Sequence, residues 1–327
     1  MSGDTTPMVT VIVPCYKVAR FLPQCLDSVL GQTYSNVRVL AVDDCSPDES
    51  ADIIREYERK DSRVKGIFHK VNSGVSIARN SGIEETDSPW LVFLDGDDWM
   101  PPNAIETLLE RQREYDVDIV CGNALEYNED GSETGVLEYP LHGRKLLTIE
   151  KNLDDVIQNQ SILCVCWGKL IRTSLVKSSG ILFDASLRHA QDTLFTHSLV
   201  LRMKPRVLLD YDEVAYCYRQ FAQSCVHAIK LDKRLGYISI LITELDKLAM
   251  ELGCSRRLIA RKAAEYFWGI RKFSENGQER KRRISETIES PLFTEHIYPV
   301  LSMFGKFKHR LLVKLLARGY AGLIKFW

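Results

Sequence analysis

Short apolar runs alternate with amphipathic stretches through the first 115 residues of the chain. The runs are five or six residues long and rich in branched side chains, which is typical of buried strands. They are Met8–Val13, Val37–Val42, Val64–Phe68 and Trp90–Leu94. Apolar residues recur at helical spacing over Phe21–Leu30 and Val75–Glu84, and Pro102 opens another such stretch that ends near Tyr115. This alternation predicts βαβ units and a mostly parallel sheet.

The helix after the second run has a recognisable start. Ser46, Pro47 and Glu49 fit the N-cap, first and third positions of a capping box. We therefore interpret these three residues as structural rather than catalytic.

Polar and aromatic residues follow three of the predicted strands. They are Tyr16 after the first strand, Asp43 and Asp44 after the second, and Asp95, Asp97 and Asp98 after the fourth. The carboxyl ends of parallel strands share one edge of a sheet, and ligands bind there in open α/β folds. We therefore expect these groups to meet.

Beyond residue 115 the pattern is less regular. The segment "YNEDGSETGV" predicts a hairpin with Asp130-Gly131 at its turn. A helix runs through Leu199 and Leu201, two strands are expected at Val207–Leu209 and Val214–Tyr218, and the chain is helical from Leu231 onward. We divide it into an N-terminal βα half (residues 1–115), a less regular second half (116–228) and a C-terminal helical region (229–327).

Composition indicates a soluble globular protein: 327 residues, 45% hydrophobic, with a net charge of −1. The near-neutral net charge argues against a nucleic-acid partner, since no broad basic surface is expected. Nine cysteines without a CxxC pair indicate reduced thiols. Neither a signal peptide nor a run long enough to span a bilayer is expected, so we predict a cytoplasmic location.

The stretch "FLDGDDW" places three carboxylates in four positions directly after an apolar run. Such a cluster is tolerated when a divalent cation with a preference for oxygen ligands neutralises it. The alternative is a solvated Asp-Gly turn.

Taken in order, several stretches resemble glycosyltransferase family 2, a family of inverting nucleotide-sugar transferases with a GT-A fold. They are "VTVIVPCYKVARFLPQCLDSVLGQTYSNVRVLAVDDCSPDES", "NSGVSIARNSGI", "WLVFLDGDDWMPP", "WGKLIRTSLV", "QDTLF" and "YCYRQFAQS". The resemblance covers roughly Val9 to Val226. It implies an α/β fold of GT-A type, with a Rossmann-like, mostly parallel sheet flanked by helices, and a nucleotide-diphosphate sugar as donor. In this fold residues 1–115 would be the nucleotide-sugar-binding half and residues 116–228 the acceptor-side half.

The resemblance also implies roles for individual residues. Asp97 would bind Mn²⁺ or Mg²⁺, with Asp95 assisting and Asp98 less clearly assigned. Nucleotide-sugar binding would involve Pro14, Tyr16, Asp43, Asp44, Arg79, Asp95 and Arg219. Within this set, Tyr16 matches a base-stacking ring, Asp43 and Asp44 match acids that bind uracil and ribose, and Arg219 with Ser224 lies near the diphosphate. For Arg79 the alternative is a surface arginine on an exposed helix face.

Asp192 stands where the family places its catalytic base, which takes the proton of the acceptor hydroxyl. Two residues depart from the family pattern. Gln191 replaces the first acid of a Glu-Asp pair, and Lys17 stands where many relatives have asparagine. The alternative for Asp192 is an acid stabilised by a helix N-terminus.

The acceptor pocket is expected to include Trp99, Trp167 and Lys169, because an aromatic face suits a sugar ring. Trp167 fits the hydrophobic core equally well. The acceptor implied by the resemblance is a glycan or a lipid-linked sugar in cell-surface polysaccharide synthesis. Oligomeric state, donor sugar and linkage are not predicted.

The last 27 residues carry six Lys or Arg and no acid. Apolar residues from Phe304 to Leu316 share one helical face and Lys306, Arg310 and Lys314 lie opposite. This pattern predicts that the tail binds peripherally to the anionic inner face of the membrane. The alternative is a helix packed on its own domain.

Two other enzyme classes were weighed against the transferase. The Asp95-Gly96-Asp97 (DxD) segment also resembles a motif of phosphohydrolases whose first Asp is a nucleophile. In those enzymes the motif lies on the first strand, whereas here it follows the fourth. A dinucleotide oxidoreductase lacks support, because no glycine fingerprint follows the first strand. The remaining alternative, an inactive glycan-binding relative, is disfavoured by the presence of both Asp97 and Asp192.

Overall fold

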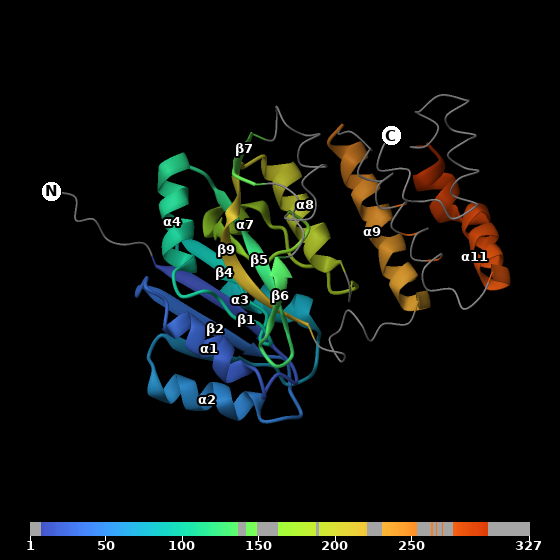
Figure 1. The fold of residues 1–327 in the computed structure, drawn as a ribbon. Coiled ribbons are helices and arrows are strands. Elements are labelled where there is room, and N and C mark those ends of the chain that lie inside the picture. Colours follow the sequence, from blue (N-terminus) through green and yellow to red (C-terminus); the bar gives the residue numbers. More distant parts are fainter. Residues whose placement is uncertain are drawn as a thin grey trace. The chain divides into compact units, whose positions relative to one another are not determined.

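The computed structural model describes residues 8–136, 142–148, 163–187, 190–220, 231–253 and 277–299, with positions 263, 266 and 270. The chain divides into two compact units, Met1–Ala222 and Gln223–Trp327 (Figure 1). Each unit is described by itself. The predicted boundary at residue 115 falls inside the first unit, between its helix α4 (Ala104–Tyr115) and strand β5 (Ile119–Asn128).

The first unit is built on a mixed sheet. Its other strands are β1 (Val9–Cys15), β2 (Val37–Asp43), β3 (Val64–Phe68), β4 (Trp90–Phe93), β6 (Glu133–Val136), β7 (Arg144–Thr148), β8 (Lys169–Arg172) and β9 (Arg206–Gln220). The strand order is β3-β2-β1-β4-β8-β5-β9-β7, and β6 pairs with β5. Strands β1 to β4 are parallel, as predicted, whereas β8 runs antiparallel between β4 and β5.

Each face of the sheet carries its own layer of helices and its own hydrophobic core (Figure 1). Val9, Val11 and Val13 pack with α1 (Leu22–Leu30), α2 (Ser50–Lys60) and α4. Ile12 points the other way and packs with α3 (Val75–Glu85), α7 (Thr173–Ser179) and α8 (Gln191–Met203). Successive side chains of a strand alternate between faces, so one buried apolar run supplies both cores.

Sequence periodicity located most of these elements. The predicted hairpin is confirmed: β5 and β6 pair antiparallel, and Gly131 takes a positive φ of 85° at the turn. The two strands expected at 207–209 and 214–218 are wrong as separate elements, because both belong to β9. The register of β9 against β5 shifts near Asn123, where the acidic stretch Asp210–Glu213 interrupts the apolar pattern.

The second unit is helical in its described residues, as predicted. It contains α9 (Leu231–Glu251), α11 (Gly277–Glu289) and a π-helical segment at Leu292–Ile297. None of the helices within the described ranges is both long and apolar enough to cross a bilayer. The basic tail at 301–327 lies outside the described residues, so its predicted membrane binding stays a prediction.

Candidate active site

The acidic groups that follow β2 and β4 converge with the end of β1 at one edge of the sheet. Cys15, the last residue of β1, lies buried among them. Its thiol pKa is raised well above the usual value, first by burial and then by four surrounding carboxylates. These are Asp43, Asp97, Asp48 and Asp95. The segments predicted to meet therefore do meet.

The loop that carries Tyr16 is held by the segment that precedes α2. Tyr16 is 43% exposed, and the Lys17 ammonium lies over its ring, 5.3 Å from the ring centroid. Three consecutive backbone amides beyond it donate to side chains of this segment: Lys17 to Ser46 Oγ (3.3 Å), Val18 to Ser50 Oγ (3.1 Å) and Ala19 to Asp48 Oδ2 (3.1 Å).

This arrangement corrects the predicted capping box. Helix α2 begins at Ser50, and its N-cap Glu49 makes no side-chain capping bond. Ser46 instead accepts from the loop amide of Lys17. The polar side chains near a helix start can satisfy distant donors as well as local ones, and sequence spacing alone does not distinguish the two.

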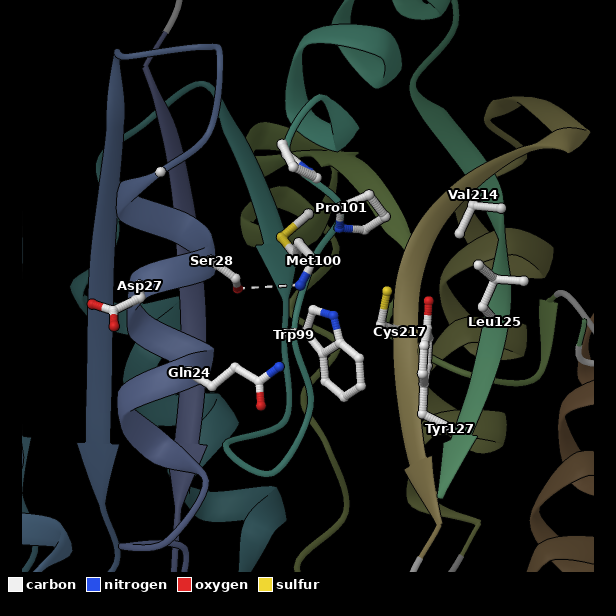
Figure 2. A pocket seen from close by; sticks show the side chains of 12 residues that line it. Gln24, Asp27, Ser28, Trp99, Met100, Pro101, Leu125, Tyr127, Val214 and Cys217 are labelled. Carbon is white, nitrogen blue, oxygen red and sulfur yellow. Dashed lines mark hydrogen bonds between the residues drawn. The ribbon is translucent and has the colours of Figure 1, made fainter. Parts of the chain in front are cut away.

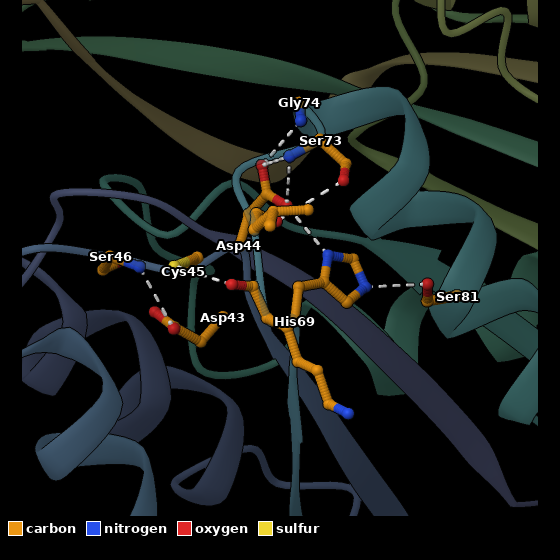
Figure 3. Close-up of polar contacts among 10 residues, drawn as sticks. Asp43, Asp44, Cys45, Ser46, His69, Ser73, Gly74 and Ser81 are labelled. Carbon is orange, nitrogen blue, oxygen red and sulfur yellow. Dashed lines mark hydrogen bonds and ion pairs between the residues drawn. The ribbon is translucent and has the colours of Figure 1, made fainter.

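Asp44 joins three segments of the chain (Figure 3). His69 Nδ1 donates to its Oδ1 at 2.8 Å, and the backbone amides of Ser73 and Gly74 donate at 3.0 and 2.6 Å. His69 Nε2 in turn lies 2.9 Å from the Ser81 hydroxyl on α3. Asp44 is 2% exposed. Its carboxylate therefore ties the ends of β2 and β3 to the start of α3.

Asp43 differs from its neighbour in how its carboxylate is used (Figure 3). Oδ2 accepts from the backbone amide of Ser46 at 3.2 Å. Oδ1 is buried and accepts no hydrogen bond from any described residue. A buried oxygen without a partner is costly, so this atom is suited to receive a donor from a ligand.

The Asp95–Asp98 loop passes close to β1 and is anchored on β9. A Cβ at Gly96 would lie 3.0 Å from Val18 Cγ2 and 3.1 Å from the carbonyl oxygen of Pro14, closer than ordinary van der Waals contact, so glycine favours this approach. Asp98 is buried and accepts from the Tyr216 hydroxyl (2.5 Å) and the Arg219 amide (2.7 Å). Asp98 is thus an anchor of the loop, while Pro14 and Gly96 define its floor.

Asp97 lies at the centre of this loop. Burial, and next the charge of Asp95, raise the pKa of its carboxyl to about 6. A nearby cation would stabilise the ionised form of this buried carboxyl.

Arg219 holds the loop from behind. Its Nε donates to the carbonyl oxygen of Asp97 at 3.0 Å, and Nη2 donates to Gln24 Oε1 at 2.5 Å. The guanidinium is sandwiched between the rings of Phe21 and Trp99, at 4.7 and 4.6 Å from their centroids. Arg219 is 4% exposed. These contacts make it a positioning residue for Asp97, and Ser224 lies outside the described residues.

Arg79 lies near both the Asp95–Asp98 loop and the predicted base, Asp192. It is 2% exposed, so the alternative of a surface arginine is wrong. Nη2 donates to Asp95 Oδ1 at 2.7 Å, while Nε and Nη1 are buried without a partner among the described residues. Burial acts to lower the pKa of Arg79, but Cys166, Asp95 and Asp192 raise it overall. The guanidinium is therefore charged and has donors to spare.

Asp192 lies in the first turn of α8, half-buried, with Oδ2 4.0 Å from Cys166 Sγ. Its neighbour Gln191 is 8% exposed, and the amide oxygen Oε1 has no partner among the described residues. Ala190, just before the helix, has a positive φ of 59°. The charges of Asp95 and Asp192 both act on Arg79, so the candidate base and the acidic loop belong to one site.

Three non-glycine residues with a positive φ flank this site. They are Lys17 (57°) after Tyr16, Cys45 (57°) after Asp44, and Ala190 (59°) before Gln191. A left-handed conformation costs an L-residue about 1–2 kcal/mol. Such strain often gathers at functional sites, where the fold imposes a turn that aims a neighbouring side chain.

Of the three predicted acceptor-side residues, one borders a cavity. Trp99 lines the groove in Figure 2. Trp167 is 8% exposed and stacks on Tyr216, with ring centroids 4.3 Å apart, so the structure places it in the core. Lys169 is 2% exposed and its Nζ donates to the carbonyl of Trp167 at 3.3 Å. Sequence alone did not reveal that both are covered.

Sequence reasoning missed His69, Cys166 and the anchoring role of Tyr216. His69 directly follows β3, so the rule that selected Asp43 and Asp95 would also have selected it. The Tyr216 ring lies in the hydrophobic core, and its hydroxyl also donates to Asp98. Nothing in the sequence pattern signals Cys166.

The site suits a cation held by few protein ligands. Within the described ranges no three His, Cys, Asp or Glu side chains form a metal cluster. Mg²⁺ and similar ions are commonly bound by one or two carboxylates together with substrate phosphates. The raised pKa of Asp97 beside Asp95 fits this mode, because a cation would relieve the repulsion between them.

The sheet and its site edge define an α/β protein of GT-A type. A crystal structure of S. aureus TarS (residues 1–349) with UDP-GlcNAc superimposes with a TM-score of 0.70 at 18% identity, covering 96% of this chain and 91% of that one. A mannosyltransferase from Pyrobaculum calidifontis, in complex with GDP-Man and Mn²⁺, gives 0.55 at 15% identity, covering 98% and 89%. These likenesses confirm the predicted fold.

Residues 10–180 match the family model described as glycosyl transferase family 2, and the chain belongs to that family. It is 33% identical over 218 residues to the uncharacterized glycosyltransferase EpsJ of Bacillus subtilis, covering 65% of this chain and 61% of EpsJ. It is 29% identical over 257 residues to the poly(ribitol-phosphate) beta-glucosyltransferase of Bacillus spizizenii, covering 77% and 39%. The chain thus spans less than two thirds of the length of these relatives.

Proposed function

We propose that this protein is a metal-dependent, inverting glycosyltransferase that uses a nucleotide-diphosphate sugar, with uridine diphosphate as the carrier, in the synthesis of a cell-surface polysaccharide. One observation carries the proposal. Buried polar atoms on three segments lack partners among the described residues, at the edge where the acidic groups converge. These atoms are Asp43 Oδ1, Arg79 Nε and Nη1, and Gln191 Oε1.

The roles follow from the chemistry of each group. The exposed Tyr16 side chain would stack on the nucleobase. Asp43 Oδ1 would accept a hydrogen bond from an N–H group of the nucleobase or from a ribose hydroxyl. Asp97 would hold Mn²⁺ or Mg²⁺ with Asp95 beside it. Such an ion, when bound, offsets the negative charge of the departing diphosphate. TarS bound to UDP-GlcNAc supports a uridine donor.

Asp192 is the proposed general base. It takes the proton of the acceptor hydroxyl while that oxygen forms a bond to the anomeric carbon. The bond from this carbon to the diphosphate oxygen breaks, and the electron pair leaves with the diphosphate. A single displacement inverts the configuration. Arg79 donates to Asp95 and supplies a positive charge that interacts with both Asp95 and Asp192.

The proposal is tested with a panel of nucleotide sugars, with and without Mn²⁺. Calorimetry should show metal-dependent binding of at least one uridine donor, and Asp97→Ala should abolish that dependence. Asp192→Asn should keep donor binding and lose transfer by a factor of about 10² or more. Unchanged transfer by Asp192→Asn would assign the base elsewhere. Metal-independent binding of equal strength would reject the role of Asp97.

A glycan or lipid-linked acceptor fits this chemistry, and the relatives named above support cell-surface synthesis. The predicted location, cytoplasmic and peripheral on the inner face of the membrane, depends on the tail at 301–327. Binding of the intact chain to anionic vesicles tests it.

A further inference from the structure

A buried thiol lies against the proposed general base. Cys166 precedes β8 and is 0% exposed, in the hydrophobic core that also holds Phe195 and Leu199 of α8. Its Sγ lies 4.0 Å from Oδ2 of Asp192. Hydrogen bonds from sulfur are long and weak, but they are real interactions. No step of the proposed reaction involves this thiol.

The thiol is the donor in this contact. Burial raises the pKa of Cys166 well above its ordinary value, although Arg79 acts to lower it. The group therefore keeps its proton at neutral pH. An ionised carboxylate can only accept, and among the described residues Asp192 is the acceptor within reach of the S–H group.

The segment that carries Cys166 also holds the first turn of α8. Thr193 Oγ1 donates to the carbonyl oxygen of Cys164 at 3.1 Å, and Thr193 is 7% exposed. Asp192 and Thr193 are consecutive, so two contacts attach residues 164–166 to the start of the helix. The contact at Oδ2 restricts rotation of the Asp192 carboxylate about its Cβ–Cγ bond, so the thiol helps to set its orientation.

Charges from three other elements surround this pair. Arg79 on α3, Asp95 after β4 and Lys169 on β8 all act on the Cys166 thiol. Arg79 also interacts with the charge of Asp192. A neutral substitution of Cys166 leaves these charges in place, so it tests the S–H contact by itself.

We infer that Cys166 is a positioning residue for the proposed base: its thiol donates to Asp192 Oδ2 and holds the carboxylate in the orientation that takes the proton of the acceptor hydroxyl. The inference rests on the proposed function, because it assumes that Asp192 is the base. The thiol itself neither gains nor loses a proton during the reaction.

Infrared spectroscopy of the full chain tests the contact without any ligand. The S–H stretching band lies where water and peptide groups absorb little, and hydrogen bonding lowers its frequency. The difference spectrum between wild type and Cys166→Ala isolates the band of this thiol from those of the other eight cysteines. In an Asp192→Asn background the band should move to higher frequency, because a neutral amide accepts more weakly than a carboxylate.

The effect on catalysis is measured as release of UDP from UDP-glucose and UDP-GlcNAc at saturating Mn²⁺, with water as the acceptor. Cys166→Ala should lower kcat about 3- to 10-fold, as expected for one lost hydrogen bond, and should change KM for the nucleotide sugar less than twofold. The acidic limb of the kcat profile should move up by about half a pH unit, because the ionised base loses a hydrogen-bond donor. Cys166→Ser restores a donor and should recover most of the loss.

Cys121→Ala is the matched control. Cys121 lies on β5, is also 0% exposed and belongs to the same hydrophobic core as Cys166. Its substitution should lower the midpoint of urea unfolding about as much as Cys166→Ala does, and should leave kcat and its pH profile unchanged. Cys166→Val keeps an apolar side chain of similar size and removes the donor, so it gives the same kinetic test if Cys166→Ala does not fold.

Two results would overturn the inference: a Cys166 band that stays in place in Asp192→Asn, or a Cys166→Ala or Cys166→Val variant with the kcat and pH profile of the wild type. Failure of the proposed function looks different. UDP release at the wild-type rate in Asp192→Asn would reject Asp192 as the base, and the role of Cys166 with it. If the wild type turns over neither nucleotide sugar, the choice of nucleotide sugar is wrong and the infrared band decides whether the thiol orients Asp192.

Discussion

The adjacent acids Asp43 and Asp44 should respond oppositely to substitution. Asp44→Ala removes the acceptor of three donors, on His69, Ser73 and Gly74, in a residue that is 2% exposed. Each buried donor left unsatisfied costs about 1–3 kcal/mol, so the free energy of unfolding should fall by about 3 kcal/mol or more. At about 2–4 °C per kcal/mol for a unit of this size, the midpoint should drop by roughly 6–12 °C.

Asp43→Asn should leave the fold nearly unchanged. Only its Oδ2 has a hydrogen-bond partner, the Ser46 amide, and the asparagine oxygen can keep that bond. We expect a stability change below about 1 kcal/mol. Donor affinity should nevertheless fall by about 10- to 100-fold, because a hydrogen bond to a charged group contributes about 1.5–3 kcal/mol.

Urea unfolding followed by fluorescence, together with calorimetric titration of UDP, measures both effects on the same samples. Asp52→Asn on the exposed face of α2 serves as the control and should change neither quantity. Equal destabilisation by Asp43→Asn and Asp44→Ala would refute the division of roles. So would an Asp43→Asn variant that binds UDP like the wild type.

Four further predictions follow from individual contacts. Cys45→Gly should raise the free energy of unfolding in urea by about 1 kcal/mol by relieving its positive φ, whereas Cys45→Ala should bring no gain. Since the Asp97 pKa is about 6, protons compete with the cation below that pH, and calorimetric Mn²⁺ affinity should fall about tenfold per pH unit there; a flat profile would contradict this. Arg219→Gln should weaken Mn²⁺-dependent UDP binding about tenfold by freeing the Asp97 loop, and unaltered binding would exclude a positioning role. Charge reversal by Lys306→Glu and Lys314→Glu should reduce sedimentation with anionic vesicles at least tenfold, at about 1 kcal/mol per basic residue, and neutral vesicles should show no difference.

The parallel half of the sheet could be predicted because its strands are short, continuous runs, and β1, β2 and β4 are buried on both faces. Once β1, β2 and β4 were placed, the shared edge followed from topology, and with it the meeting of Tyr16, Asp43 and Asp97. These inferences depend on patterns within a few residues and on one general rule of sheet geometry.

Other features depend on contacts between distant segments, and the sequence does not encode them as a pattern. Ser46 looked like a helix cap and binds the amide of Lys17, 29 residues away. Trp167 fitted the core and an acceptor pocket equally well, and Lys169 looked available to an acceptor. The structure buries both: Trp167 stacks on Tyr216 of β9, and Lys169 lies on β8 between β4 and β5. A strand's neighbours decide which of its side chains are covered, and one sequence does not reveal them.

The bonds from the pre-α2 segment to the amides of Lys17, Val18 and Ala19 bear on how this protein can be re-engineered. The ring of Tyr16 is carried on a loop whose shape is specified some thirty residues later in the chain. In a chimera that imports this loop from a relative, the new backbone would have to present its amides to Ser46, Ser50 and Asp48, which are placed for the native loop. Recombination should therefore transplant both stretches as one cassette.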